Sequence, residues 1–201
     1  MIDAYLAPMV DRMLKPPART LAARGIAADH ITLVGFGIGA LAVPAIALGW
    51  WTLALAAILI NRLCDGLDGA VARMNAPTER GAFLDIALDF VFYALIPLGF
   101  ALNDPAANAL PAVILLAAFL GTGSSFLAFA VIAAKRGESA PEFPTKGIYY
   151  LGGLTEGFET ILVFVLMCLL PTAFPFLAYG FATACAATTA LRWRQGWVAF
   201  G

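Results

Sequence analysis

Hydrophobic residues fill four long stretches of the chain that contain no Asp, Glu, Lys or Arg: residues 31–60, 90–103, 105–134 and 161–191. An α-helix needs about 20 mostly apolar residues to cross a bilayer, so the longest stretches must contain turns. Turn-forming residues lie near 49–51, 103–105, 135–146 and 171–175. Cutting the chain at these places predicts six membrane-spanning helices, at about 30–48, 52–73, 81–102, 107–134, 147–169 and 174–191.

The first 25 residues follow a different pattern. Apolar side chains recur there at helical spacing, with charged residues between them: Ile2, Tyr5, Leu6, Met9 and Met13. This predicts an amphipathic helix that lies in the membrane interface. Pro16-Pro17 is expected to break the helix, and Gly25 to end its second piece. The segment is interpreted either as a simple anchor or as a lid over a groove through which lipid enters.

Composition supports a membrane protein, because 62% of residues are hydrophobic and 12% are charged, against about a quarter charged in soluble domains. The predicted fold is all-α: a single domain over residues 1–201, with an interfacial helix at 1–25 and a six-helix transmembrane bundle at 30–194. Eleven of the twelve Lys and Arg residues fall on one side of this layout. By the positive-inside rule, both termini face the cytoplasm, as in a bacterial inner membrane. Basic residues near the N-terminus favour anionic lipid headgroups, and nothing suggests nucleic acid.

Four aspartates interrupt the apolar pattern: Asp65, Asp68, Asp85 and Asp89. A carboxylate inside a membrane is costly unless it is paired, hydrated or metal-bound. Spacings of three and four residues place two carboxylates on one face of each of two neighbouring helices. An all-oxygen set without His or Cys suits Mg²⁺ or Mn²⁺, and a pair of ions about 4 Å apart fits phosphoryl chemistry. The open end of this cluster is expected to face the cytoplasm.

Small residues and a cation follow the first two aspartates. Gly69 and Ala72 leave a flat surface that a nucleotide can approach closely, and Arg73 supplies a planar cation for a diphosphate. Together these residues resemble the signature of the CDP-alcohol phosphotransferase (CDP-alcohol phosphatidyltransferase) family: Asp-x2-Asp-Gly-x2-Ala-Arg, a gap, then Gly-x3-Asp-x3-Asp. All eight signature positions are present: Asp65, Asp68, Gly69, Ala72, Arg73, Gly81, Asp85 and Asp89. The gap at 74–80 holds seven residues where eight are expected, which leaves the details of nucleotide contact open.

The resemblance implies an enzyme of phospholipid biosynthesis that is commonly a homodimer. The phosphatidyl group of CDP-diacylglycerol would pass to a small polar alcohol with release of CMP. Asp65, Asp68 and Asp85 would bind metal, and Asp89 would act as general base and as a further ligand. Asp68, Gly69, Ala72, Arg73 and Gly81 would contact the nucleotide. Two alternatives stay open: transfer of a CDP-linked headgroup to a lipid or second alcohol, and transport of a divalent cation through the membrane.

The acceptor alcohol is left unassigned by the sequence. Arg62, Glu156 and Glu159 are predicted to lie at similar depths, so an ion pair between the arginine and a glutamate is one interpretation. Alternatively, the two glutamates and Tyr149 help form an acceptor pocket, which would suit a cationic alcohol.

Asp29 and a group of small residues in the fourth predicted span each have two interpretations. Asp29 either caps the first span or contacts nucleotide, because 29–32 resembles the family's Asn-x-x-Thr entry to that span. The small residues Gly121, Gly123, Ser124 and Ser125 allow close helix packing, within the chain or at a dimer seam.

Overall fold

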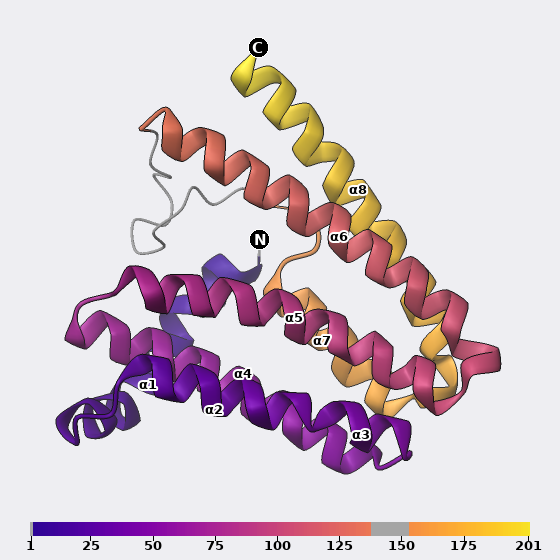
Figure 1. The fold of residues 1–201 in the computed structure, drawn as a ribbon, viewed down its shortest axis with the longest axis horizontal. Helices are drawn as coiled ribbons and strands as arrows, with labels where there is room; N and C mark the ends of the chain where they lie inside the picture. Colours follow the sequence, from indigo (N-terminus) through magenta and orange to yellow (C-terminus); the bar gives the residue numbers. More distant parts are fainter. Residues whose placement is uncertain (1, 138–152) are drawn as a thin grey trace.

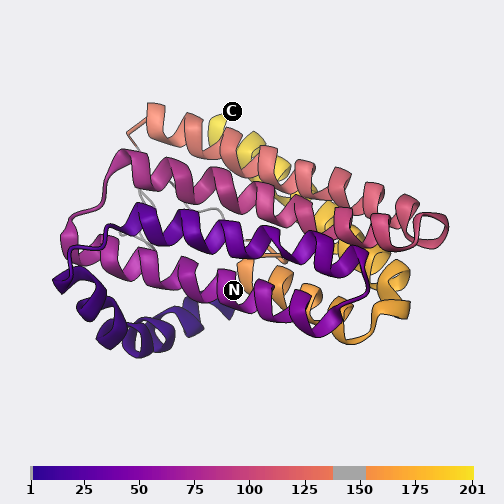
Figure 2. The same ribbon diagram turned by 60° about the horizontal axis from the view of Figure 1, so that its bottom comes forward.

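The computed structural model describes residues 2–137 and 153–201, with side chains from residue 10 onward. Within these ranges the secondary structure is helical, without strands, which confirms the predicted all-α class. The helices are α1 (Ile2–Ala23), α2 (Ala28–Ala40), α3 (Ala42–Ala47), α4 (Trp51–Asn75), α5 (Glu79–Asn103), α6 (Pro105–Lys135), α7 (Gly157–Leu169), the 3-10 turn η1 (Pro171–Ala173) and α8 (Phe174–Phe200). In the bundle, α2 packs on α4, α3 on α5, α5 on α6, and α6 along α8, while α1 lies against α4 (Figures 1 and 2).

Within the described residues, four segments are long and apolar enough to cross a membrane: Ala28–Ala47, Glu79–Asn103, Pro105–Lys135 and Pro171–Phe200. The chain is therefore an integral membrane protein. Helix α7 is apolar but shorter, and α4 carries Arg62 at its middle and Asp65 and Asp68 in its second half. The total of six spans and the interfacial position of α1 stay predictions.

Glycine and proline explain where the first helices end. Gly25 has a positive φ of 74°, and the Ile26 N–H donates to the Leu21 carbonyl at 3.1 Å, which closes α1 as predicted. The predicted span 30–48 is divided at Leu41, because Pro44 has no N–H to offer the Ala40 carbonyl.

Two predicted boundaries are wrong. Helix α1 continues through Pro16-Pro17, where a break was expected, and the fully buried Ala18 packs there against α4. In the described part of the predicted span 147–169, the helix begins at Gly157, since residues 153–156 are irregular. The reason is local: Glu156 and Glu159 form a capping box that starts α7. Residues 147–152 of that predicted span lie outside the described residues.

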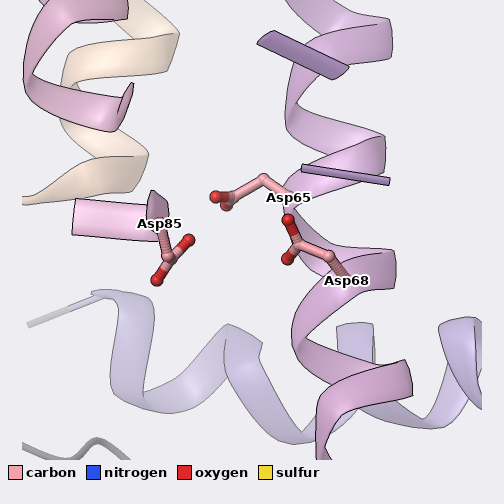
Figure 3. Close-up of side chains that lie close together, drawn as sticks. All are labelled: Asp65, Asp68 and Asp85. Carbon is pink, nitrogen blue, oxygen red and sulfur yellow. The ribbon is translucent and has the colours of Figure 1, made fainter. Parts of the chain in front are cut away.

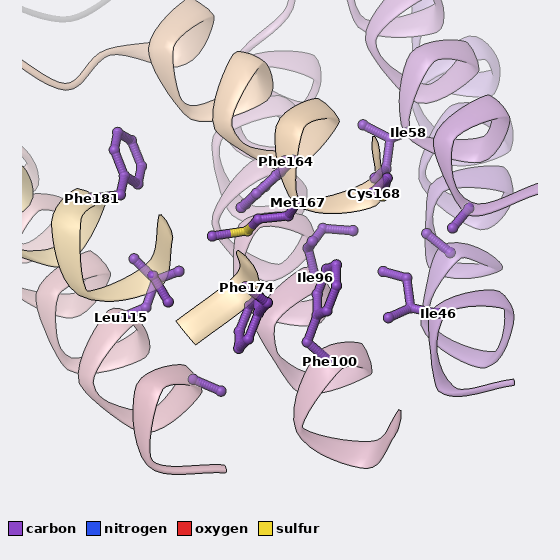
Figure 4. Packing of buried hydrophobic residues seen from close by; sticks show 14 of the residues in the cluster. Ile46, Ile58, Ile96, Phe100, Leu115, Phe164, Met167, Cys168, Phe174 and Phe181 are labelled. Carbon is purple, nitrogen blue, oxygen red and sulfur yellow. The ribbon is translucent and has the colours of Figure 1, made fainter. Parts of the chain in front are cut away.

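The hydrophobic core lies at the end of α5 away from its aspartates. Phe92, Ile96 and Phe100 of α5 are fully buried in one core with Phe164 of α7 and Phe174 of α8. Figure 4 shows Ile96 and Phe100 beside the two rings from α7 and α8. The Phe100 and Phe174 rings stack with centroids 4.3 Å apart. This packing joins helices from both halves of the chain and so sets the position of the α5 segment that carries Asp85 and Asp89.

Close approach of α2 to α4 depends on glycine. A Cβ placed on Gly35 would lie 2.4 Å from the Cβ of Cys64, and one on Gly39 would lie 2.9 Å from the Asn61 side chain. The two backbones therefore lie closer together than they could with a larger residue at Gly35 or Gly39. The α6 glycines are also used within the chain: Gly121 faces Thr189 of α8, and Gly123 faces the Phe90 ring of α5.

Candidate active site

Three of the four predicted aspartates converge. Asp65 and Asp68 lie one turn apart on α4, and the Asp85 carboxylate faces them from α5 (Figure 3). One carboxylate oxygen from each lies within 4.8 Å of the other two. Asp68 is buried, Asp65 is half-buried and Asp85 is exposed, so the cluster opens on one side. Three anionic oxygens at this separation, with no nitrogen or sulfur donor among them, fit a hard divalent cation such as Mg²⁺ or Mn²⁺.

The buried carboxylate of Asp68 has a partner on a different helix. The Thr32 hydroxyl on α2 donates a hydrogen bond to Asp68 Oδ2. Because Gly35 lets α2 approach α4 one turn further along, Thr32 reaches a residue 36 positions away. The hydroxyl thus orients one carboxylate of the cluster and compensates part of the cost of burying it.

Asp89 is held differently from the other three aspartates. Its Oδ1 accepts a hydrogen bond from Nη2 of Arg62 at 2.7 Å, while Arg62 Nη1 lies 3.5 Å from Oδ2 of Asp65. The prediction that Arg62 pairs with Glu156 or Glu159 is therefore wrong, because its ionic partners are these two aspartates. An i, i+3 spacing between Arg62 and Asp65 on α4 was the sequence signal for this contact.

One pocket collects these groups. It is lined by Thr32, Gly35, Phe36, Asn61, Arg62, Asp65, Asp68, Asp85, Leu88 and Asp89. All four signature aspartates and the half-buried Arg62 thus border the same space, which lies between α2, α4 and α5. Asn61 was not singled out by the sequence, although an amide within an apolar run is a signal of the same kind as the charges beside it.

The predicted nucleotide-binding residues lie around the end of α4 and the start of α5. Arg73 extends beside Gly69, where an added Cβ would be 3.3 Å from Arg73 Nη1. Gly81 donates its backbone N–H to the Thr78 hydroxyl at 3.0 Å, in the first turn of α5. Ala72 is half-buried between them along α4. Along their helices, these residues lie next to the acidic cluster.

Arg73 also contacts the N-terminal helix, which the sequence did not indicate. Its Nη2 donates to Oδ1 of Asp11 at 2.8 Å, and Lys15 Nζ lies 3.1 Å from the other oxygen of that carboxylate. Hydrogen bonds from Lys15 and Arg73 hold the pKa of Asp11 below its ordinary value. The contact joins α1 to the end of α4 that carries the signature.

Of the residues proposed for the acceptor, Arg62 lines this pocket, whereas Glu156 and Glu159 are not among its lining residues. Glu156 accepts the backbone N–H of Gly153 at 3.1 Å, and Glu159 accepts the N–H of Glu156 at 3.1 Å, at the start of α7. Tyr149 lies outside the described residues. Asp29 is not the cap of α2, whose N-cap residue is Ala27; it forms an ion pair with Arg80 instead.

The chain is similar in sequence and in fold to known proteins. The chain is 54% identical to the inner membrane protein YnjF of Escherichia coli over 198 residues, which cover 98% of this chain and 96% of that protein. Two solved structures of the Mycobacterium tuberculosis phosphatidylinositol phosphate synthase share its fold. One, with CDP-DAG bound, has a TM-score of 0.74 and 21% identity over 92% of this chain and 94% of that chain. The other, in complex with manganese and citrate, has a TM-score of 0.72 and 22% identity over 92% of this chain and 88% of that chain.

The match to a protein family covers most of the chain. Residues 26–192 match the family described as CDP-alcohol phosphatidyltransferase. That range contains the whole acidic cluster and every helix from α4 to α7. The chain therefore belongs to the CDP-alcohol phosphatidyltransferase family.

Proposed function

We propose that the protein transfers the phosphatidyl group of CDP-diacylglycerol to a small polar alcohol and releases CMP. The observation that carries this proposal is the convergence of Asp65, Asp68 and Asp85 in one pocket that also contains Asp89. A structural neighbour with the same fold was solved with CDP-DAG bound, which supports a lipid-linked donor. Long apolar helices in the same bundle are consistent with a donor that carries acyl chains.

The positions of the signature residues support a role for each of them. Asp65, Asp68 and Asp85 would hold Mg²⁺ or Mn²⁺, which when bound neutralises the diphosphate and stabilises the departing CMP. Arg73 would contact the diphosphate beside the surface formed by Gly69 and Ala72. Gly81 would border the nucleotide from α5.

Proton transfer is assigned to Asp89. Arg62 occupies its Oδ1, so Oδ2 would accept the proton of the acceptor hydroxyl. A new bond then forms between the acceptor oxygen and the phosphorus of the phosphatidyl group. The bond from that phosphorus to the bridging diphosphate oxygen breaks, and the electron pair leaves with CMP.

The proposed setting is the cytoplasmic side of a membrane, with both termini and the pocket facing the cytoplasm. A homodimer stays a prediction, and the α6 glycines that suggested it pack within the chain. For the acceptor, we keep Arg62, Tyr149, Glu156 and Glu159 as candidates; of these, Arg62 lines the pocket.

The test supplies purified protein with radiolabelled CDP-diacylglycerol and, in turn, serine, glycerol phosphate, inositol phosphate, choline and ethanolamine. We expect a labelled lipid product with one of them, together with CMP, and loss of both in excess EDTA. Asp89→Asn should abolish turnover while the donor still binds. Turnover undiminished in EDTA would contradict the proposal, and product formed only from a CDP-linked headgroup would reverse the polarity of transfer.

A further inference from the structure

Asn61 is a buried amide on α4, and its contacts fix which way the amide faces. Only 5% of the residue is exposed. Its Nδ2 donates to the Gly35 carbonyl of α2 at 3.0 Å, and its Oδ1 accepts from Nε and Nη2 of Arg62 at 2.9 and 2.7 Å. A carbonyl can only accept and a guanidinium can only donate, so the reversed amide would lose all three hydrogen bonds. Asn61 therefore has one stable orientation, with its oxygen toward Arg62.

The packing of α2 on α4 holds this amide in place. A Cβ on Gly39 would lie 2.9 Å from Cγ and Nδ2 of Asn61, so the side chain fills the space that the glycine leaves open. Gly35 and Gly39 are four positions apart and share one face of α2. The amide is thus enclosed at the helix interface and cannot follow the guanidinium if the arginine moves.

Arg62 has two anionic partners to choose between. Its Nη2 lies 2.7 Å from Oδ1 of Asp89 on α5, and its Nη1 lies 3.5 Å from Oδ2 of Asp65, one turn away on the same helix. The guanidinium carbon lies 4.9 Å from the centre of the Phe92 ring, which stabilises the cation without directing it to either carboxylate. An arginine can reach a carboxylate three positions along its own helix without help from another helix. Because Asn61 holds Nε and Nη2, it keeps Nη2 at Asp89.

We propose that Asn61 is a positioning residue for proton transfer: by holding Arg62, it keeps the guanidinium on Oδ1 of Asp89 and leaves Oδ2 for the acceptor hydroxyl. This inference rests on the proposed transfer, in which Asp89 accepts that proton. A carboxylate held at one oxygen rotates less, so its other oxygen keeps a fixed direction. The amide then has two separate roles, because its bond to Gly35 serves helix packing and its bonds to Arg62 serve the reaction.

The test compares kcat, the KM for CDP-diacylglycerol and the Tm of purified variants. Asn61→Leu keeps the approximate size of the side chain and removes its three hydrogen bonds. The matched control is Asn108→Leu, because Asn108 of α6 is 6% exposed and donates to the Phe100 carbonyl at 3.0 Å, at the other end of α5. Both variants should have a lower Tm. Only Asn61→Leu should lower kcat, by about tenfold to a hundredfold with KM within about twofold. Equal kcat values in the two variants would overturn the proposal.

Two further variants separate positioning from packing. Asn61→Asp keeps an oxygen for Arg62 but loses the donor to Gly35, so it should lower the Tm and keep kcat within about threefold of wild type. It also keeps the proposal testable if Asn61→Leu does not fold. In the Arg62→Gln background, Asn61→Leu should cause no further loss of kcat, because Asn61 acts through Arg62. A multiplied loss in the double variant, or a kcat of Asn61→Asp as low as that of Arg62→Gln, would overturn the proposal.

A readout without turnover follows the same contact in EDTA-treated protein. A hydrophobic carbodiimide modifies carboxyl groups, and mass spectrometry locates the adduct, with the exposed Asp85 of the same helix as internal reference. Because Arg62 covers one oxygen of Asp89, modification of Asp89 relative to Asp85 should rise at least about threefold in Asn61→Leu and stay unchanged in Asn108→Leu.

The two readouts distinguish failure of this inference from failure of the proposed function. An unchanged modification ratio in Asn61→Leu would overturn the positioning role and leave the proposed transfer standing. If wild type turned over no acceptor while the ratio rose as expected, the proposed transfer would be overturned and the contact from Asn61 through Arg62 to Asp89 would stand.

Discussion

Arg80, at the start of α5, donates from Nε to Oδ2 of Asp29 on α2 at 2.7 Å, and its Nη2 lies 2.6 Å from the same oxygen. The pair closes the gap between α2 and α5 next to Gly81, whose added Cβ would be 3.1 Å from Asp29 Oδ1. Residues 29–32 resemble a segment with Asn in place of Asp29, and an isolated carboxylate near the proposed donor site would repel a diphosphate. Its neutralisation by Arg80 removes that conflict.

Removing this cation should weaken donor binding more than it destabilises the fold. The Arg80 side chain is 78% exposed, so Arg80→Gln should change the free energy of unfolding by less than about 1 kcal/mol. The KM for CDP-diacylglycerol should rise roughly threefold to tenfold, because the Asp29 charge is then uncompensated. Asp29→Asn combined with Arg80→Gln should restore a KM near that of wild type. Steady-state kinetics in mixed micelles gives the KM of the single and the double variant. A KM of the double variant as high as that of Arg80→Gln would contradict the explanation.

The Thr32 hydroxyl should be needed for tight metal binding. Thr32→Val keeps the shape of the side chain but leaves the buried Asp68 carboxylate without its donor, so Mn²⁺ affinity should fall by about tenfold. Thr32→Ser retains a hydroxyl and is the matched control. Titration with Mn²⁺ followed by electron paramagnetic resonance gives the affinity. Equal affinities in the Val and Ser variants would show that the hydrogen bond does not orient Asp68.

Gly35 and Gly37 offer a matched pair on one helix. Gly35→Ala would bring its Cβ against Cys64 and push α2 from α4, at a cost of about 1–3 kcal/mol in unfolding free energy. Gly37→Ala meets no atom within 4 Å and should cause no loss. Thermal unfolding in detergent, followed by circular dichroism, should show a lower Tm for Gly35→Ala and an unchanged Tm for Gly37→Ala. A similar Tm for both would mean that the close approach is not needed for stability.

The Asp11–Arg73 ion pair should hold α1 on the bundle, with a definite pH dependence. Because the pKa of Asp11 is lowered in the folded protein, the pair contributes fully above the ordinary value of 3.8 and is lost as the pH falls through the lowered pKa. The strength with which α1 is held on the bundle should therefore not change with pH near neutrality. At pH 7, Asp11→Asn should speed amide hydrogen exchange in α1 roughly twofold to fivefold, as expected for an exposed pair.

Arg12→Gln provides the control for that measurement, since Arg12 is an exposed cation on the same helix. Its exchange rates should match those of wild type. Faster exchange in both variants would indicate that the overall charge of α1, and not its contact with Arg73, sets the docking.

Local spacing explains what the sequence predicted well. Residues three or four positions apart share a face of a helix, so the pairing of Asp65 with Asp68 needed no knowledge of the rest of the chain. Turns at Gly25 and Gly49 were predictable for a similar reason, because a positive φ is readily available to glycine. The signature itself is local in the same sense, and it was sufficient to indicate the family.

The partners of Arg62, Glu156 and Glu159 could not be predicted in this way. Matching their depths assumed that the fifth span was helical from residue 147, whereas the capping box places both glutamates at the first turn of α7. A helix start moved by several residues displaces a side chain by about 1.5 Å for each residue, which is enough to separate an ion pair.

By itself, the sequence determined that the chain is an all-helical membrane protein with an acidic, oxygen-rich site, because hydrophobicity and helical periodicity are properties of neighbouring residues. Only the tertiary structure decided which groups meet that site from elsewhere. Thr32 reaches Asp68 across 36 residues, and Arg73 reaches Asp11 across 62. Such contacts depend on how closely two helices pack and how each is rotated about its axis. Packing and rotation are set by the fit of many side chains at once, as at Gly35 and Cys64, and not by any local pattern.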